Sequence, residues 1–145
     1  MEFESQICTT REQSEKLLSL GLKRETADMH HYKWSEGYWD IQACPPRGTE
    51  SCYIPAWSLH RLMCLCPVKL GPDDGGERAS WDMYAPDEYE LQVSHDFAQY
   101  LDDEARYGGE RLNCFWGEGN GYNALIKCIE WLINEGHFNK EYLEE

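Results

Sequence analysis

The chain has 145 residues, and its 27 Asp and Glu outnumber its 13 Lys and Arg to give a formal net charge of −14 at pH 7. That charge repels phosphate backbones and anionic lipid headgroups, which argues against direct nucleic-acid binding and against attachment to a membrane surface. Hydrophobic residues at 41% and aromatic residues at 13% are enough to form one core at this length, so we predict a single domain over residues 1–145.

The first predicted element is a capped helix over residues 9–21. It starts with two threonines, and an acid or an amide follows three positions after each, which is the pattern of a capping box. Gly21 is placed to end the helix, and Leu22 is placed to fold back onto its apolar side.

A β-hairpin is the next predicted element. Residues 29–34 alternate as a strand does, Gly37 interrupts the pattern, and residues 38–41 form the partner strand. A proline-rich loop follows. A second helix is predicted over residues 58–66, because apolar side chains recur there at intervals of three and four residues up to Pro67.

The second half of the chain opens with its most acidic stretch. Residues 73–104 hold eleven acids and one base, a local charge of −10. Alternation predicts a second hairpin from residues 81–84 and 89–93 and a further strand over 111–116, and a wide apolar stripe predicts a helix over 122–135. Together these elements predict an α+β fold in which an antiparallel sheet of about four to five strands packs with about three helices.

The cysteines and the first residues of the chain bear on its compartment. The seven cysteines are odd in number and irregularly spaced, unlike a secreted disulfide scaffold, so we expect reduced thiols. The first residues are acidic and do not form a secretory signal, and no run approaches the roughly 18 apolar residues of a membrane span. These features predict a cytoplasmic protein.

Familiar catalytic and metal-binding signatures are missing from the sequence. Neither G-x-S-x-G nor H-E-x-x-H occurs, so an enzyme is not favoured and no catalytic residue is predicted. His60 and Cys64 share a face of the second predicted helix, but no second pair at zinc-like spacing accompanies them. We therefore predict no metal site and no cofactor.

The aromatic residues are the strongest indication of function. The chain has 6 Trp, 9 Tyr and 4 Phe, more than a core of this size requires, and such rings stack on nucleobases or anchor protein interfaces. The alternative for any single ring is packing in the core. The predicted ligand-binding residues are four tryptophans for stacking and two arginines for an anion, namely Trp34, Trp57, Trp81, Trp116, Arg106 and Arg111.

Four short segments carry a resemblance to a known family. They are residues 12–22 (EQSEKLLSLGL), 25–29 (ETADM), 54–59 (IPAWSL) and 128–136 (CIEWLINEG). In these segments the chain resembles a family of small uncharacterised proteins encoded by phages and mobile elements of gut bacteria of the Bacteroides type. The resemblance carries no catalytic residue over. It implies a genomic context in which accessory proteins often counter host defences, with the host-cell cytoplasm as the compartment.

Composition and this context leave three functions open. In the first, which we rank ahead, a non-enzymatic protein sequesters a nucleotide-like immune signal in an aromatic-lined pocket, which a homo-oligomer interface could form. In the second, an acidic, DNA-mimicking surface binds and inhibits a host defence protein. In the third, the protein is a small nucleotide hydrolase. The aromatic residues favour the first function, and the acidic segment 73–104 favours the second.

Overall fold

A computed structural model describes residues 6–67, 69–70, 77–84, 91–97, 113–117 and 121–145, with the backbone alone described between residues 69 and 117. The chain divides into two compact units. Unit 1 comprises Met1–Leu65 and Lys140–Glu145, and unit 2 comprises Cys66–Asn139. The single domain over residues 1–145 stays a prediction.

Unit 1 begins with helix α1 (Arg11–Ser19), whose two ends match the sequence signals. The Thr10 hydroxyl accepts a hydrogen bond from the backbone N–H of Gln13 at 3.1 Å, and the Gln13 side chain accepts one from the Thr10 N–H at 2.9 Å. Gly21 has a φ of 95°, and the N–H of Leu22 donates back into the last turn at 3.2 Å. The predicted capping box and glycine stop are confirmed.

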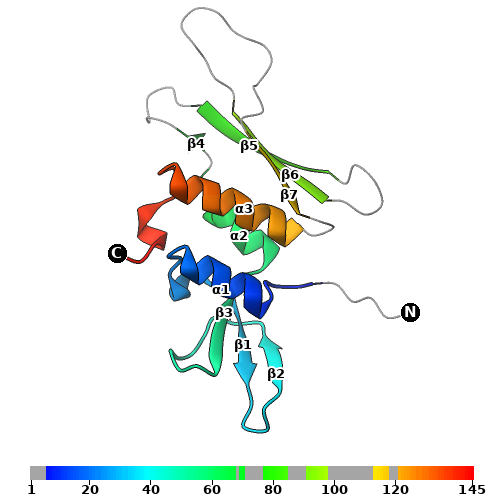
Figure 1. The fold of residues 1–145 in the computed structure, drawn as a ribbon, viewed down its shortest axis with the longest axis vertical. Helices are drawn as coiled ribbons and strands as arrows, with labels where there is room; N and C mark the ends of the chain where they lie inside the picture. The colour runs from blue at the N-terminus through cyan, green and yellow to red at the C-terminus, as the bar shows by residue number, and fades with distance from the viewer. Residues whose placement is uncertain (1–5, 68, 71–76, 85–90, 98–112, 118–120) are drawn as a thin grey trace, which may run out of the picture. The chain divides into compact units, whose positions relative to one another are not determined.

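The sheet of unit 1 has three antiparallel strands in the order β2-β1-β3 (Figure 1). β1 (Met29–Lys33) pairs with β2 (Trp39–Gln42) through the predicted hairpin and with β3 (Tyr53–Ala56) on its other side. β3 was not predicted from the sequence, and it contains Pro55. Proline is accepted in this strand because β3 lies at the sheet edge, where one side makes no ladder bonds.

Three short elements complete unit 1. The 3-10 turn η1 (Arg24–Thr26) leads into β1, and α2 (Leu59–Leu65) follows β3, in agreement with the second predicted helix. Near the C-terminus, η2 (Lys140–Tyr142) belongs to the same unit, and Leu143 beyond it forms a β-bridge with Leu22. Unit 1 is therefore built from both ends of the sequence.

The core of unit 1 contains Trp57, which is fully buried. Its indole N–H donates to the hydroxyl of Thr26 at 3.0 Å, and its backbone N–H donates to the hydroxyl of Thr9 at 3.0 Å. These two bonds tie the segment between β3 and α2 to η1 and to the residues that precede α1.

Unit 2 combines a four-stranded antiparallel sheet, in the order β4-β5-β6-β7, with a single described helix (Figure 1). Helix α3 (Gly121–Asn134) packs against β6 and β7 and matches the predicted last helix. In the second predicted hairpin, which is confirmed, Met83 lies opposite Val93. The strands are β4 (Lys69–Leu70), β5 (Glu77–Tyr84), β6 (Leu91–Phe97) and β7 (Asn113–Gly117).

The predicted fold class is confirmed at the level of a small α+β protein. The described residues form three α-helices and antiparallel strands. The strands lie in two sheets, of three and four strands, and not in the single sheet of four to five strands that we predicted. Hydrophobic alternation identifies a strand but does not say which strands pair, so it could not reveal the division.

Candidate functional site

The two faces of the unit 1 sheet have different surroundings. Successive strand residues point to opposite faces, so His30 lies on one face of β1 and His31 on the other. The buried His31 has its Nε2 atom 2.8 Å from the carbonyl oxygen of Thr9. On the same face, the Arg11 guanidinium lies 4.7 Å from the ring centre of Trp39. Thr9 and α1 thus lie over the part of this face that carries His31 and Trp39.

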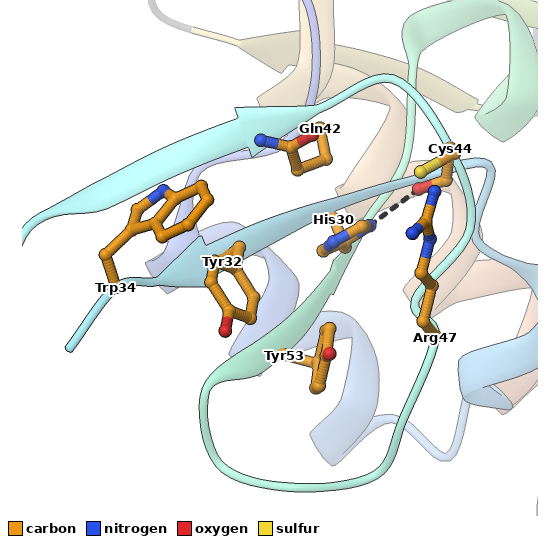
Figure 2. Close-up of a pocket in the computed structure, with 7 residues that line it drawn as sticks. All are labelled: His30, Tyr32, Trp34, Gln42, Cys44, Arg47 and Tyr53. Carbon is orange, nitrogen blue, oxygen red and sulfur yellow. Dashed lines mark hydrogen bonds between the residues drawn. The ribbon is translucent and has the colours of Figure 1, made fainter.

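The opposite face carries a pocket of about 250 Å³ (Figure 2). Side chains from all three strands line the pocket, and Trp34, which follows β1, lies at one end of it. Cys44 and Arg47 line it from the β2–β3 loop. Pockets for drug-sized ligands usually measure roughly 300–1,000 Å³, so this one suits a single ring system. The lining residues are His30, Tyr32, Trp34, Gln42, Cys44, Arg47 and Tyr53.

Aromatic rings form a continuous wall along this pocket. The Tyr32 ring lies 5.1 Å from Tyr53 and 5.0 Å from Trp34, centre to centre, and meets Trp34 edge to face at 85°. At one end His30 lies 5.6 Å from Tyr53, and at the other Trp34 stacks on Tyr38 at 6.2 Å. Because the rings support one another, the wall is already formed before a planar ligand arrives.

The β1–β2 hairpin sets the position of Trp34. The backbone N–H of Trp34 donates to the Tyr38 carbonyl at 3.0 Å, and the N–H of Gly37 donates to the Trp34 carbonyl at 2.9 Å. Gly37 takes a φ of 95°, the left-handed conformation expected at the last position of a three-residue hairpin loop. The turn leaves the Trp34 side chain 40% exposed, so part of the ring is open to a ligand.

The β2–β3 loop is held in place by hydrogen bonds to backbone carbonyls. The Nδ1 atom of His30 lies 2.7 Å from the carbonyl oxygen of Cys44 (Figure 2). From η1, the Arg24 guanidinium donates to the carbonyls of Tyr53 at 2.7 Å and Gly48 at 3.4 Å. These bonds hold the loop at both of its ends.

Arg47 supplies the positive charge of the pocket. Its side chain is exposed, and within the described ranges it forms no ion pair with a carboxylate. A guanidinium is charged at every physiological pH, and its fork of N–H donors fits a phosphate or carboxylate group. Beside it, desolvation and then the Tyr32 phenol raise the pKa of Tyr53 above its usual value near 10, so this hydroxyl remains a donor at neutral pH.

Of the predicted ligand-binding residues, Trp34 lines this pocket and Trp57 does not. Trp57 has an exposed fraction of 0%, so no face of its ring is open for stacking unless the core of unit 1 rearranges. The structure gives it a packing position, the alternative that the sequence analysis left open for any single ring.

The other predicted site residues are in unit 2. Trp81 lies in β5 and Trp116 in β7, where the backbone alone is described. Arg106 and Arg111 lie outside the described residues, and the side chains of the acidic segment 73–104 do as well. Their predicted roles in binding a ligand or a host defence protein therefore stay predictions.

Sequence reasoning missed most of the pocket residues. Alternation within the predicted strand 29–34 already placed Tyr32 on the same face as His30 and Trp34, and this signal could have identified them as a group. Tyr53 and Arg47 could not be found in this way, because they belong to the unpredicted β3 and to an irregular loop.

Two further features bear on chemistry. The Nε2 atom of His60 lies 3.4 Å from the Sγ atom of Cys64, which confirms that the pair shares one face of α2. In the part of the chain that the structure describes, no three His, Cys, Asp or Glu side chains gather as metal ligands would.

Among those same residues, no helix has both the length and the apolar character needed to cross a membrane.

No protein-family model matches the chain, and neither curated proteins nor solved structures include a significant match. The geometry of the pocket therefore carries the functional argument.

Proposed function

We propose that this protein binds a small planar anion of the nucleotide class in the pocket of unit 1 and holds it without chemical change. The observation that carries the proposal is the combination of an aromatic wall, which includes Tyr32, Trp34 and Tyr53, with the guanidinium of Arg47. A nucleobase stacked on such a ring gains about 1–3 kcal/mol. The arginine then provides a partner for the phosphate.

The size and chemistry of the pocket support sequestration of a mononucleotide. A volume of about 250 Å³ admits one base, with the sugar and phosphate directed toward the exposed Arg47. His30 contacts the backbone carbonyl of Cys44 through Nδ1, so this nitrogen does not activate the neighbouring thiol as a nucleophile.

The resemblance to phage and mobile-element proteins supplies the biological part of the proposal. In a host cell, a protein that holds a nucleotide-derived immune signal lowers the free concentration of that signal and so counters the defence that depends on it. A non-enzymatic role in the host cytoplasm is the form of this function that we propose.

The direct test is calorimetric titration of the purified protein with AMP, GMP, CMP and UMP, with mass spectrometry of the bound nucleotide. We expect at least one of the four to bind and to be recovered intact. Binding of the ligand to the folded state also raises the melting temperature. A chemically altered nucleotide would identify an enzyme, and the absence of binding by all four would overturn the proposal.

Variants of two tryptophans in the same hairpin locate the site. Trp34→Ala removes a stacking ring from the pocket and should weaken binding by about 5- to 150-fold, the equivalent of about 1–3 kcal/mol. Trp39→Ala is the matched control, because Trp39 lies on the covered face beneath Arg11. An equal loss of affinity in the two variants would show that the ligand binds elsewhere.

A further inference from the structure

The imidazole of His30 presents an unused hydrogen-bond acceptor to the pocket. Its Nδ1 atom lies 2.7 Å from the carbonyl oxygen of Cys44, and a carbonyl only accepts, so Nδ1 carries the hydrogen. In the neutral ring, Nε2 then holds a lone pair. The side chain is 2% exposed, and no atom of the described residues bonds to Nε2. Figure 2 shows this end of the ring turned away from Cys44.

The carboxamide of Gln42 presents a second acceptor. Its Nε2 atom donates to the Asp40 carboxylate at 2.8 Å. Because a carboxylate only accepts, this bond fixes which end of the carboxamide is the nitrogen. The oxygen of Gln42 is left without a partner among the described residues, and the side chain lines the pocket.

The strand register places these two acceptors next to each other. His30 on β1 and Gln42 on β2 are direct cross-strand partners, so their side chains project side by side from one face of the sheet. His30 is buried, so its unpartnered acceptor carries a desolvation penalty that a ligand donor relieves, and the oxygen of the half-buried Gln42 lies beside it. Two adjacent acceptors match a group with two N–H bonds.

We propose that the pocket selects a base with an exocyclic amino group, whose two N–H bonds are donated to His30 Nε2 and to the Gln42 carboxamide oxygen. This inference rests on the proposed function and specifies its ligand class. Adenine, cytosine and guanine carry such a group, whereas hypoxanthine and uracil carry a carbonyl oxygen in its place. That carbonyl oxygen is itself an acceptor and would face the two acceptors of the pocket. None of the three atoms would then have a hydrogen-bond donor.

The experiment compares nucleotides that differ at this one group, with the protein unchanged. AMP, IMP and purine riboside 5′-monophosphate share the sugar, the phosphate and the fused ring, and CMP and UMP form a second pair. We expect the amino-bearing member to bind about tenfold or more tightly than its partners, both in the purine set and in the pyrimidine pair.

The outcomes separate this inference from the proposed function. Equal binding of AMP, IMP and purine riboside monophosphate would overturn amino-group selection and leave nucleotide binding in place. Tighter binding of IMP would also overturn it, because the pocket would then be acting as a donor. Failure of every nucleotide to bind would overturn both proposals.

A protein variant gives an independent check. Gln42→Met keeps the length of the side chain and removes the acceptor, so it should reduce the ratio of AMP to IMP affinity by several-fold. Gln6→Met is a control outside the pocket, since Gln6 contacts Gln13 and the Cys8 carbonyl near α1. An unchanged AMP to IMP ratio in a folded Gln42→Met protein would exclude Gln42 from base recognition.

Discussion

Two tryptophans of this protein differ in burial and therefore in role: one packs in the core and the other lines the pocket. Trp57 is fully buried and bonds to the Thr26 hydroxyl through its indole N–H, whereas Trp34 is 40% exposed and lines the pocket. Both rings follow short apolar or alternating runs in the sequence. What distinguishes them is the tertiary surroundings, which determine whether a ring face is left for a ligand.

Trp57→Ala should destabilise the fold. Removal of the buried ring leaves a cavity and takes away the N–H that donates to the Thr26 hydroxyl, whose own hydrogen bond to the Lys23 carbonyl remains. We expect the free energy of unfolding to fall by about 3–5 kcal/mol. Denaturant titration measures this change. Trp57→Phe, which retains most of the ring volume, should lose less. A folded Trp57→Ala protein of normal stability with weakened ligand binding would contradict the packing role.

His31 makes stability depend on pH. Burial, more than the nearby Arg11 and His30, lowers the pKa of His31 below its ordinary value of 6.5, although the Thr9 carbonyl acts in the opposite direction. Below about pH 6.5 the unfolded chain takes up a proton that the folded chain does not. The free energy of unfolding should therefore decrease as the pH falls through 6.5, and this part of the stability is fully present above it.

Unfolding in urea between pH 5 and pH 8 tests this expectation. His31→Gln should flatten the profile in the region below pH 6.5, whereas His60→Gln, at an exposed position on α2, should leave its shape unchanged. A wild-type profile that rises toward acidic pH would contradict the assignment.

Among the elements, the β1–β2 hairpin links the backbone most directly to the site. Its turn sets Trp34 opposite Tyr38, and Gly37 supplies a left-handed residue to the turn. A Cβ atom added to Gly37 would meet no atom within 4 Å. The cost of a substitution there is therefore in the backbone conformation and not in a collision.

Gly37→Ala should lower the free energy of unfolding by about 1 kcal/mol, because an alanine pays for the left-handed conformation that glycine adopts freely. Gly37→Asn should lose less, since asparagine tolerates this region better. Thermal unfolding followed by circular dichroism compares the three proteins. Equal stability of Gly37→Ala and the parent would show that the turn does not require this conformation.

The elements that were predicted correctly are those with local signals. The ends of α1 follow from Thr10 and Gly21, whose capping interactions involve residues close in sequence. β3 was missed because Pro55 is typical of a loop, and its place in the sheet depends on the distant β1. Local chemistry is readable from the sequence, and long-range pairing is not.

The same distinction applies to the pocket. Trp34 was predicted as a stacking residue, and the alternation of β1 placed Tyr32 beside it. The contribution of Arg47 depends on a loop that Arg24 holds from η1, more than twenty positions earlier in the chain. No periodicity in the sequence predicts that this loop brings Arg47 to the pocket. The cation of the site could therefore be found only in the structure.

At the scale of the whole molecule, the net charge of −14 opposes the approach of an anionic ligand. Arg47 acts over a short range, whereas the repulsion extends over about a Debye length, near 10 Å at 0.1 M salt. Added salt screens the repulsion first. The association rate constant for a nucleotide should therefore rise between 20 and 200 mM NaCl, as stopped-flow fluorescence of the pocket tryptophan would measure.

The acidic-inhibitor hypothesis predicts the opposite salt effect for its own partner, a basic protein. A surface that binds a basic partner through carboxylates loses association rate as salt increases. A nucleotide association rate that falls steeply with salt would indicate that a strongly positive surface, and not Arg47 within an acidic protein, attracts the ligand.

Residues 140–145 belong to unit 1, and this determines when the contacts of that unit can form during synthesis. The Lys23 N–H donates to the Tyr142 carbonyl at 2.9 Å and the Glu144 N–H to the Gly21 carbonyl at 2.7 Å, and the Lys23 ammonium reaches the Glu141 carbonyl 118 positions away. On the ribosome, residues that line the pocket emerge long before these partners do. Unit 2, Cys66–Asn139, is synthesised in that interval, so the sheet of unit 1 lacks these three hydrogen bonds until residues 141–144 have emerged.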